Sequence, residues 1–149
     1  MKLLIQRVST ASVEVDNQIV SSIQQGVMAL VGFDKHDTTE TLGSMAKKLL
    51  NFKIFNDQNG KISRSILETN HQLLVVPQVT LSVGTKKGNK PSFSKAADPK
   101  KSFHFFQEFI QIIRSTKTEC EIGSFGSDMS VRLVNDGPVT FGLKINPNN

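Results

Sequence analysis

The sequence lacks the features of a membrane-spanning, exported or disulfide-linked protein. Its 149 residues include a single cysteine, Cys120, which can form neither an internal disulfide nor a cysteine-based metal cluster. No apolar run approaches the roughly 20 residues of a membrane-spanning helix. The first apolar stretch is broken at Gln6 and Arg7, too early for a signal peptide. We therefore expect a cytoplasmic protein in a reducing compartment.

The usual signatures of hydrolytic and cofactor chemistry are also missing. The sequence has no glycine-rich phosphate-binding signature and no histidine pair at metal-ligand spacing. Its 3 histidines fall in expected turns or on a helix surface. Cys120 lies between two glutamates, which would raise the pKa of a thiol rather than lower it, so it is a poor candidate nucleophile. We expect neither a metal nor a cofactor.

Positive charge is in excess and is concentrated in one segment. The chain has 18 Lys and Arg against 13 Asp and Glu, for a net charge of +5. Segment 84–101 holds a cluster of lysines opposed by one acidic residue, Asp98; they are Lys86, Lys87, Lys90, Lys95, Lys100 and Lys101. Long Gly-, Ser- and Pro-rich loops such as 82–99 are usually functional, and this one would attract a phosphate backbone. The alternative is a loop that is merely solvated.

Alternating and continuous apolar runs predict β structure. The run 12–15, the turn Asp16-Asn17 and the run 18–20 predict a hairpin. The nearly continuous apolar run 27–33 predicts a central strand. Further strands are expected at 73–81, 129–135 and 139–145, the last two around a turn at 135–138.

Helical spacing of apolar residues predicts two helices. The first runs from about Thr38 to Asn51 and begins with Asp37 as an acidic cap. The second follows Asp98-Pro99 and carries a stripe of Phe and Ile that fits core packing. Because these helices interrupt the strands, we expect a single α/β domain, 1–149, with mixed, largely antiparallel β-sheets and helices packed on one side.

Small polar residues and glycines gather at the predicted strand ends. They occur at Gln78 and Thr80 on one strand, and in segments 92–94, 123–126 and 135–140. Glycines let a ligand approach the backbone, and exposed N–H groups can stabilise an oxyanion without a titrating side chain. Ordinary turns are the alternative interpretation of each segment.

Six motifs that include these residues resemble the D-aminoacyl-tRNA deacylase family in order and spacing. The resemblance extends from Met1 to about Leu143. The motifs are Arg7-Val8 with 11–15, Lys53-Ile54-Phe55-Asn56-Asp57 with Asn59-Gly60-Lys61, Pro77-Gln78-Val79-Thr80-Leu81, Lys90-Pro91-Ser92-Phe93-Ser94, Phe125-Gly126-Ser127-Asp128-Met129, and 133–141 around Gly137-Pro138.

The resemblance implies a homodimeric, metal-independent enzyme that removes D-amino acids, or glycine mischarged on alanine tRNA, from the 3′-terminal adenosine of tRNA. It places the active sites at the dimer interface, where a Gly-Pro dipeptide with a cis bond reaches into the partner's pocket. Gly137-Pro138 matches that dipeptide. Rigid main-chain atoms can hold the substrate's α-carbon and leave no space for an L side chain.

The resemblance also assigns roles to single residues. Gln78 and Thr80 match the family's active-site strand, with Thr80 either a nucleophile or an orienting group. Phe125 and Met129 match a pocket-forming segment, and Arg7 matches an arginine that supports the Gly-Pro element. We thus expect a catalytic set of Thr80, Gln78, Gly137, Pro138 and Phe125, and substrate contacts from Pro77, Arg7, Met129, Lys86, Lys87 and Lys90.

Pro77 departs from the family pattern, because most members carry Ser there, and Pro has no backbone N–H to donate. A sister group of animal deacylases, which edits L-alanyl-tRNA, shares this Pro but carries Tyr and His after its Gly-Pro. This sequence has Val139-Thr140-Phe141 instead, which favours D-specificity. An L-alanyl specificity and a non-catalytic tRNA-binding protein are the alternatives, with a Cys120-dependent hydrolase a remote third.

Overall fold

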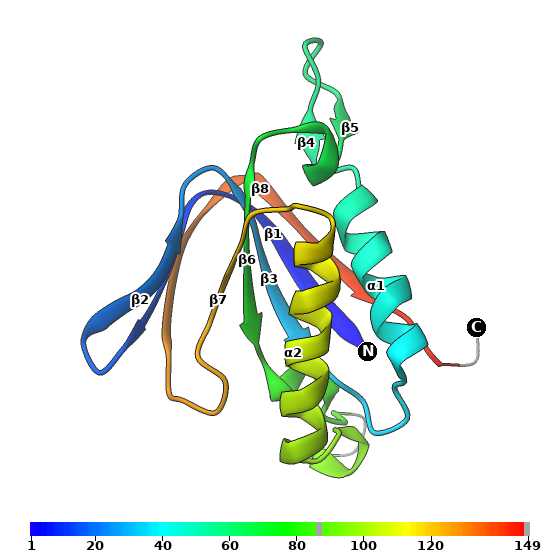
Figure 1. Cartoon of the computed structure of the whole chain (residues 1–149). Coiled ribbons are helices and arrows are strands. Elements are labelled where there is room, and N and C mark those ends of the chain that lie inside the picture. The colour runs from blue at the N-terminus through cyan, green and yellow to red at the C-terminus, as the bar shows by residue number, and fades with distance from the viewer. Residues whose placement is uncertain (86–87, 148–149) are drawn as a thin grey trace.

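A computed structural model describes residues 1–85 and 88–147, and in it a mixed β-sheet carries both long helices on one face (Figure 1). The sheet has 6 strands, and β1 contacts three of them. They are β1 (Lys2–Val15), β2 (Gln18–Ile23), β3 (Gly26–Gly32), β6 (Gln72–Pro77), β7 (Cys120–Ile122) and β8 (Ser130–Lys144). A separate two-stranded sheet is formed by β4 (Phe55–Asn56) and β5 (Ile62–Arg64).

The strand directions confirm the mixed sheet. β1 pairs antiparallel with β2, β3 and β8, whereas β6 runs parallel to both β3 and β7. The predicted hairpin is present between β1 and β2, and its turn residues Asp16 and Asn17 have φ angles of 50° and 62°. These positive angles are what a two-residue turn between twisted strands requires.

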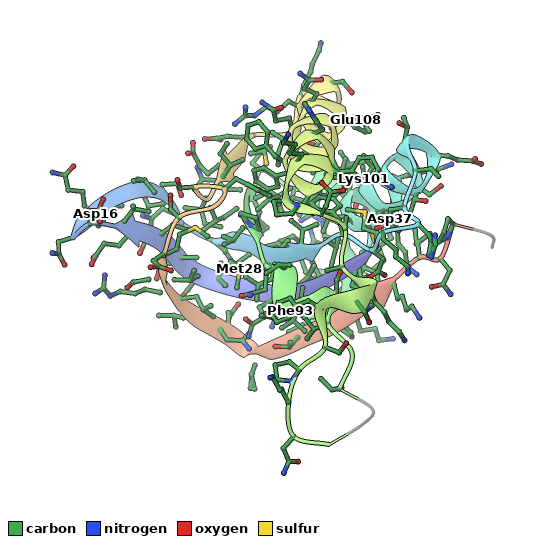
Figure 2. All side chains as sticks on the ribbon, turned by 90° about the horizontal axis from the view of Figure 1, so that it is seen from below. Asp16, Met28, Asp37, Phe93, Lys101 and Glu108 are labelled. Atoms are coloured by element: carbon green, nitrogen blue, oxygen red, sulfur yellow. The ribbon has the colours of Figure 1, made fainter. Side chains whose placement is uncertain are left out.

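The core lies between the sheet and helices α1 (Thr39–Asn51) and α2 (Pro99–Ser115), which lie side by side on it (Figures 1 and 2). Each helix turns one apolar stripe inward, as the spacing predicted. Burying such side chains stabilises the fold by about 1.5–3 kcal/mol each. The buried helix residues are Leu42, Met45, Ala46, Leu49 and Leu50 of α1 and Phe106, Phe109, Ile110 and Ile113 of α2.

The start of α1 differs from the prediction. Thr38, not Asp37, is the N-cap: its hydroxyl oxygen accepts from the N–H of Thr41, and the Thr41 hydroxyl oxygen accepts from the N–H of Thr38. Asp37 is 2% exposed and accepts a hydrogen bond of 2.6 Å from the N-terminal ammonium of Met1. A buried ammonium needs an anionic partner, which explains why Asp37 turns away from the helix. Asp98 caps α2 as predicted and accepts from the N–H of Lys101.

Two predicted strand boundaries are wrong. The strand expected at 73–81 ends at Pro77, and the chain turns into a short 3₁₀ helix, η2 (Val79–Ser82), so Gln78 and Thr80 lie beyond the strand. The strands expected at 129–135 and 139–145 form one strand, β8. Its register against β1 shifts at the predicted turn, because residues 136–139 face the single residue Arg7 between the pairs Gln6–Thr140 and Val8–Asn135. The turn residues thus form a bulge in a strand that the long β1 continues to pair.

No helix in the described ranges is long and apolar enough to cross a membrane.

Candidate functional site

A cavity of about 480 Å³ lies at the carboxyl ends of β3 and β6. Its walls come from these strand ends, the start of α2 and the segment 125–131. A volume of this size is within the range of small-ligand pockets. Ligands commonly bind outside the carboxyl ends of parallel strands. Its lining includes Pro77, Gln78, Val79, Phe125 and Met129.

Four residues predicted from the motifs therefore line one cavity: Pro77, Gln78, Phe125 and Met129. Thr80 lies two residues beyond Gln78 in η2 and is exposed to solvent. The side-chain amide nitrogen of Gln78, Nε2, donates to the hydroxyl oxygen of Thr80. This hydrogen bond joins the two side chains at the edge of the cavity.

The position of η2 depends on Gly32 at the end of β3. A Cβ added to Gly32 would lie 2.8 Å from the Cβ of Leu81, closer than real Cβ contacts allow, and 3.0 Å from the carbonyl oxygen of Gln78, which is also tight. The N–H of Gln78 also donates to the carbonyl oxygen of Val31 at 2.7 Å. The segment 78–82 therefore packs directly on the β3 backbone. Sequence reasoning gave Gly32 no role, although a glycine that ends a buried apolar run can signal close backbone approach.

The opposite wall is the segment that carries Phe125. Its ring packs against two phenylalanines of α2, Phe103 and Phe106, with centroids 5.4 and 5.8 Å away. Gly123 brings this segment close to β6, since a Cβ there would lie 3.1 Å from the sulfur of Met129 and 3.2 Å from Cδ of Pro77. Pro77 thus fills space between β6 and this wall.

Arg7 holds the bulge that contains Gly137-Pro138. Its side chain is mostly buried, and Nε donates to the carbonyl oxygen of Asp136 at 3.1 Å. Nη1 donates to the carbonyl oxygen of Ile54 and to Oδ1 of Asn56, both at 3.0 Å. One guanidinium therefore joins β1, the bulge of β8 and the small β4–β5 sheet.

The peptide bond between Gly137 and Pro138 is cis, as the resemblance implied. Both residues are exposed, and neither lines the cavity of its own chain in the described structure. Asn56 supports Arg7 and is not among the site residues expected from the sequence: it belongs to one of the motifs, but no local pattern connects it to Arg7, which is 49 positions away.

Cys120 and His71 lie away from the cavity, whose described lining includes one acidic side chain, Asp128. Cys120 is buried in β7, and burial raises the pKa of its thiol to about 12, with a smaller contribution from Glu121. The expected direction is confirmed, but burial is the main cause. Burial and the charge of Arg64 lower the pKa of His71, whose ring packs 4.4 Å from that of Phe55. Neither residue lines the cavity.

Within the described residues, no three His, Cys, Asp or Glu side chains lie close enough together to hold a metal ion.

The lysine-rich segment extends from the sheet on the side away from the helices (Figure 2). Its base is closed by hydrogen bonds of 2.7 and 3.0 Å between the backbones of Gly84 and Ser92. Lys90 is exposed, whereas Lys86 and Lys87, also expected to contact substrate, lie outside the described residues. Lys101 is engaged internally: its ammonium donates to the carbonyl oxygen of Lys35 and lies 5.0 Å from the centre of the Phe105 ring.

Comparison with known proteins agrees with this architecture. A family model described as D-Tyr-tRNA(Tyr) deacylase matches residues 4–144. Two curated D-aminoacyl-tRNA deacylases, from Teredinibacter turnerae and Shewanella denitrificans, are 50% and 45% identical to the chain; each alignment covers 97% of this chain, and 99% and 100% of the relatives.

Solved structures share the fold over nearly the whole chain. One titled c-Myc DNA Unwinding Element Binding Protein is 37% identical, with a TM-score of 0.93, and the match covers 98% of this chain and 99% of that one. A probable eukaryotic D-amino acid tRNA deacylase is 19% identical, with a TM-score of 0.82 and coverage of 95% and 98%, and shows the shared fold.

Fold, cavity and motifs together define an aminoacyl-tRNA deacylase, a hydrolase of the ester bond between an amino acid and tRNA. The chain belongs to the D-Tyr-tRNA(Tyr) deacylase family. The family and the deacylase activity expected from the sequence are thereby confirmed.

Proposed function

We propose that the cavity beside Gln78 and Thr80 holds the aminoacyl-adenosine end of a D-aminoacyl-tRNA, whose ester bond is hydrolysed there. The observation that carries this proposal is the convergence of Pro77, Gln78, Phe125 and Met129, from motifs far apart in sequence, on one cavity. Its apolar side chains suit an adenine ring, and nearby main-chain groups suit the amino group and the carbonyl oxygen of the ester.

The chemistry relies on orientation and backbone hydrogen bonds rather than on a titrating nucleophile. Water attacks the ester carbonyl, main-chain N–H groups of residues 79–80 and 124–126 stabilise the oxyanion, and the bond to the ribose oxygen then breaks. The proton lost by water passes to the leaving ribose oxygen, assisted by the neighbouring 2′-hydroxyl. Thr80, bonded to Gln78, orients the substrate.

Rates on matched substrates test this function. Purified protein should hydrolyse D-tyrosyl-tRNA and leave L-tyrosyl-tRNA almost intact, because an L side chain would project into the cavity wall. Equal hydrolysis of the two, or of neither, would contradict the proposal. Tight tRNA binding without turnover would favour a non-catalytic tRNA-binding protein, and hydrolysis of L-alanyl-tRNA alone would favour the specificity of the sister group.

Thr80→Ala separates the two roles open to Thr80. An orienting hydroxyl predicts a loss of about tenfold in rate, whereas a nucleophilic hydroxyl predicts loss of nearly all activity.

We also propose that glycine mischarged on alanine tRNA is a second substrate. Hydrolysis of this species by the purified wild-type protein tests the proposal. Glycine has no side chain for the wall to reject.

We infer that two chains form a homodimer in which Gly137-Pro138 of each chain completes the cavity of the other. Both residues are exposed and lie outside their own cavity. Large apolar side chains beside the cavity and beside the dipeptide are exposed as well: Val79 at the cavity is 48% exposed, and Val134 on β8 is 57% exposed. Self-association would bury this apolar surface.

Complementation between two defective variants tests the shared site. Gly137→Ala impairs the dipeptide, and Phe125→Ala impairs the cavity wall, so each homodimer should be nearly inactive. After subunit exchange in a 1:1 mixture, about half of the dimers are mixed and hold one intact site of two, which predicts about a quarter of wild-type activity. If native mass spectrometry shows that mixed dimers have formed and the activity still does not recover, the shared site is refuted.

We propose that the lysine-rich segment 84–101 contacts tRNA phosphates and that the protein acts in the cytoplasm. Lys90 is exposed near the closed base of the segment. Replacing Lys86, Lys87 and Lys90 with Ala should reduce the slope of log affinity against log salt by about 2–3 if all three contact phosphates, with little effect on hydrolysis of aminoacyl-adenosine. An unchanged slope would show that the segment is only solvated.

A further inference from the structure

The first residue of β1 connects the sheet to η2, the segment next to the cavity. Lys2 pairs in register with Gly32 of β3 and with Lys144 of β8. Directly paired residues have side chains on the same face of a sheet, so Lys2 lies beside the position where Gly32 has none. η2 occupies that space, and a Cβ on Gly32 would lie 2.8 Å from the Cβ of Leu81.

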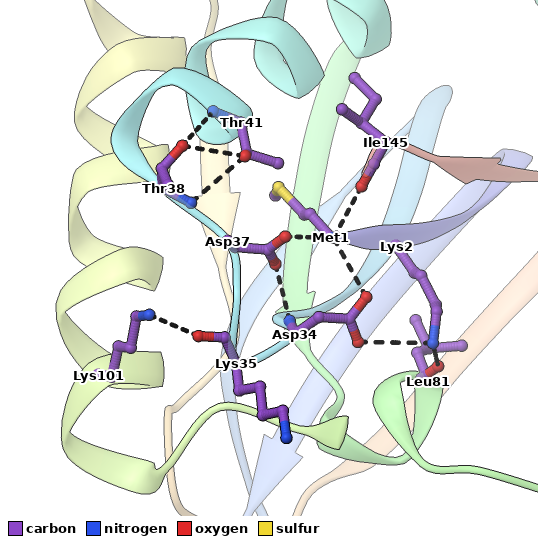
Figure 3. A network of polar contacts seen from close by, with 10 residues as sticks. All are labelled: Met1, Lys2, Asp34, Lys35, Asp37, Thr38, Thr41, Leu81, Lys101 and Ile145. Atoms are coloured by element: carbon purple, nitrogen blue, oxygen red, sulfur yellow. Dashed lines mark hydrogen bonds and ion pairs between the residues drawn. The ribbon is translucent and has the colours of Figure 1, made fainter. Parts of the chain in front are cut away.

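Lys2 crosses this space to the end of η2. Its ammonium donates to the main-chain carbonyl oxygen of Leu81 at 3.1 Å (Figure 3). No main-chain N–H of the described residues donates to that oxygen. In η2 the N–H of Leu81 donates to the carbonyl oxygen of Gln78, and the N–H of Val83 donates to that of Thr80. The Lys2 ammonium is thus its donor.

Asp34 fixes the Lys2 ammonium in place. Oδ1 of Asp34 lies 3.5 Å from Nζ of Lys2, and Oδ2 lies 3.3 Å from the N-terminal ammonium of Met1 (Figure 3). Oδ1 is buried and accepts no hydrogen bond from the residues that the structure describes, so the Lys2 charge is its compensation. The side chains of Lys2 and Asp34 are only 26% and 20% exposed, which limits screening by water.

These contacts hold η2 at both of its ends. At the start, the N–H of Gln78 donates to the carbonyl oxygen of Val31 at 2.7 Å. At the other end, the carbonyl of Leu81 is held by Lys2. Thr80 lies between the two attachments, and its main-chain position therefore depends on both.

We propose that Lys2 is a positioning residue for hydrolysis: its ammonium, fixed by Asp34, holds the end of η2 and thereby sets Gln78 and Thr80 against β3. The proposal rests on the proposed function in one respect, that Gln78 and Thr80 meet the substrate. Lys2 itself touches no lining residue of the cavity among its hydrogen bonds and ion pairs.

Three variants isolate the ammonium from the rest of the side chain. Lys2→Met keeps the length of the stem and removes the charge, and Lys2→Arg keeps charged donors. Lys144→Met is the matched control, because Lys144 is the exposed register partner of Lys2 and makes no ion pair or side-chain hydrogen bond with a described residue. The control removes the same charge from the same region of the sheet.

We expect Lys2→Met to lower kcat on D-tyrosyl-tRNA by about tenfold with KM changed less than about threefold, because misplacement of reacting groups acts on the chemical step. Lys2→Arg should restore kcat to within about threefold of wild type, and Lys144→Met should stay within about twofold. Assays run well below the melting temperature of every variant, measured in parallel, so that global unfolding does not contribute.

Hydrogen exchange supplies a second readout that is independent of activity. The N–H of Val83 donates to the carbonyl oxygen of Thr80 within the turn that Lys2 holds. Peptides covering 79–83 should therefore exchange faster in Lys2→Met than in Lys144→Met. The proposal requires both effects: unchanged kcat, or unchanged exchange at 79–83, would overturn it. If the wild-type protein does not hydrolyse D-tyrosyl-tRNA, the proposed function fails, while exchange still reports whether Lys2 holds η2.

Discussion

Gly137→Ala is the most direct test of how the bulge of β8 is built. Gly137 has a φ angle of +131°, a conformation that L side chains rarely adopt. A Cβ there would lie 2.7 Å from Cγ2 of Val139, 3.0 Å from Nη2 of Arg7 and 3.2 Å from the N–H nitrogen of Val139. Two of these atoms, Nη2 of Arg7 and the main-chain nitrogen of Val139, belong to groups that are already held in place.

The size of the effect follows from these distances. Ordinary carbon–carbon contacts are about 3.5–4.0 Å, so the new methyl must displace its neighbours or the bulge by about 1 Å. Arg7 cannot withdraw freely, because Nη1 is bonded to the carbonyl oxygen of Ile54 and to Asn56. The backbone conformation costs about 1–3 kcal/mol in free energy of unfolding. In the proposed homodimer this segment completes the partner's cavity, where a shift of about 1 Å costs about a hundredfold in rate.

The assay is hydrolysis of D-tyrosyl-tRNA at equal protein concentration, with urea unfolding as the measure of stability. Gly142→Ala is the matched control: it lies on the same strand, and a Cβ there meets no atom within 4 Å. We expect kcat/KM to fall about a hundredfold in Gly137→Ala and less than about twofold in Gly142→Ala. Near wild-type activity in Gly137→Ala would refute the view that this main-chain segment must be positioned closely.

Three further predictions concern groups outside the cavity. Asp37→Ala removes the carboxylate that binds the buried ammonium of Met1 at 2.6 Å and leaves only Asp34, at 3.3 Å, as its anionic partner; it should lower the free energy of unfolding in urea by about 2–3 kcal/mol. Since burial lowers the pKa of His71, the unfolded chain takes up the proton first, and stability falls as pH drops through the usual histidine pKa. The melting temperature of His71→Gln should consequently fall less than that of wild type between about pH 7.5 and about pH 5.5, and an equal fall would contradict this assignment. Cys120→Ala should keep wild-type kcat, because a thiol with a pKa of about 12 stays protonated and lies outside the cavity; loss of turnover in a folded variant would restore a thiol mechanism.

Local sequence signals predicted the elements that local interactions determine. The Asp16-Asn17 turn requires positive φ angles that these residue types tolerate, and the structure has them. The start of α2 follows from Asp98 and Pro99, since an aspartate cap and a first-turn proline act within a few residues.

The errors occur where contacts from distant parts of the chain decide. Asp37 has the chemistry of a helix cap, but the Met1 ammonium, 36 positions away, binds it instead. Gln78 and Thr80 continue an apolar strand pattern, yet the chain leaves the sheet after Pro77, where η2 packs on Gly32. The β8 bulge looks like a hairpin turn in sequence, and only its pairing with β1 keeps it within one strand.

The contrast between local signals and distant contacts also applies to the candidate site: motifs identify some of its residues and not others. Pro77, Gln78, Phe125 and Met129 could be found because they belong to motifs of the family, and they line one cavity. The supporting groups carry no such signal. Gly32 lets η2 pack on β3 by lacking a side chain, and Asn56 holds the guanidinium of Arg7, which supports the β8 bulge. The proposed main-chain site places its constraints on the residues that support the backbone, so substitutions at these supports should alter the rate although the supports lie outside the cavity.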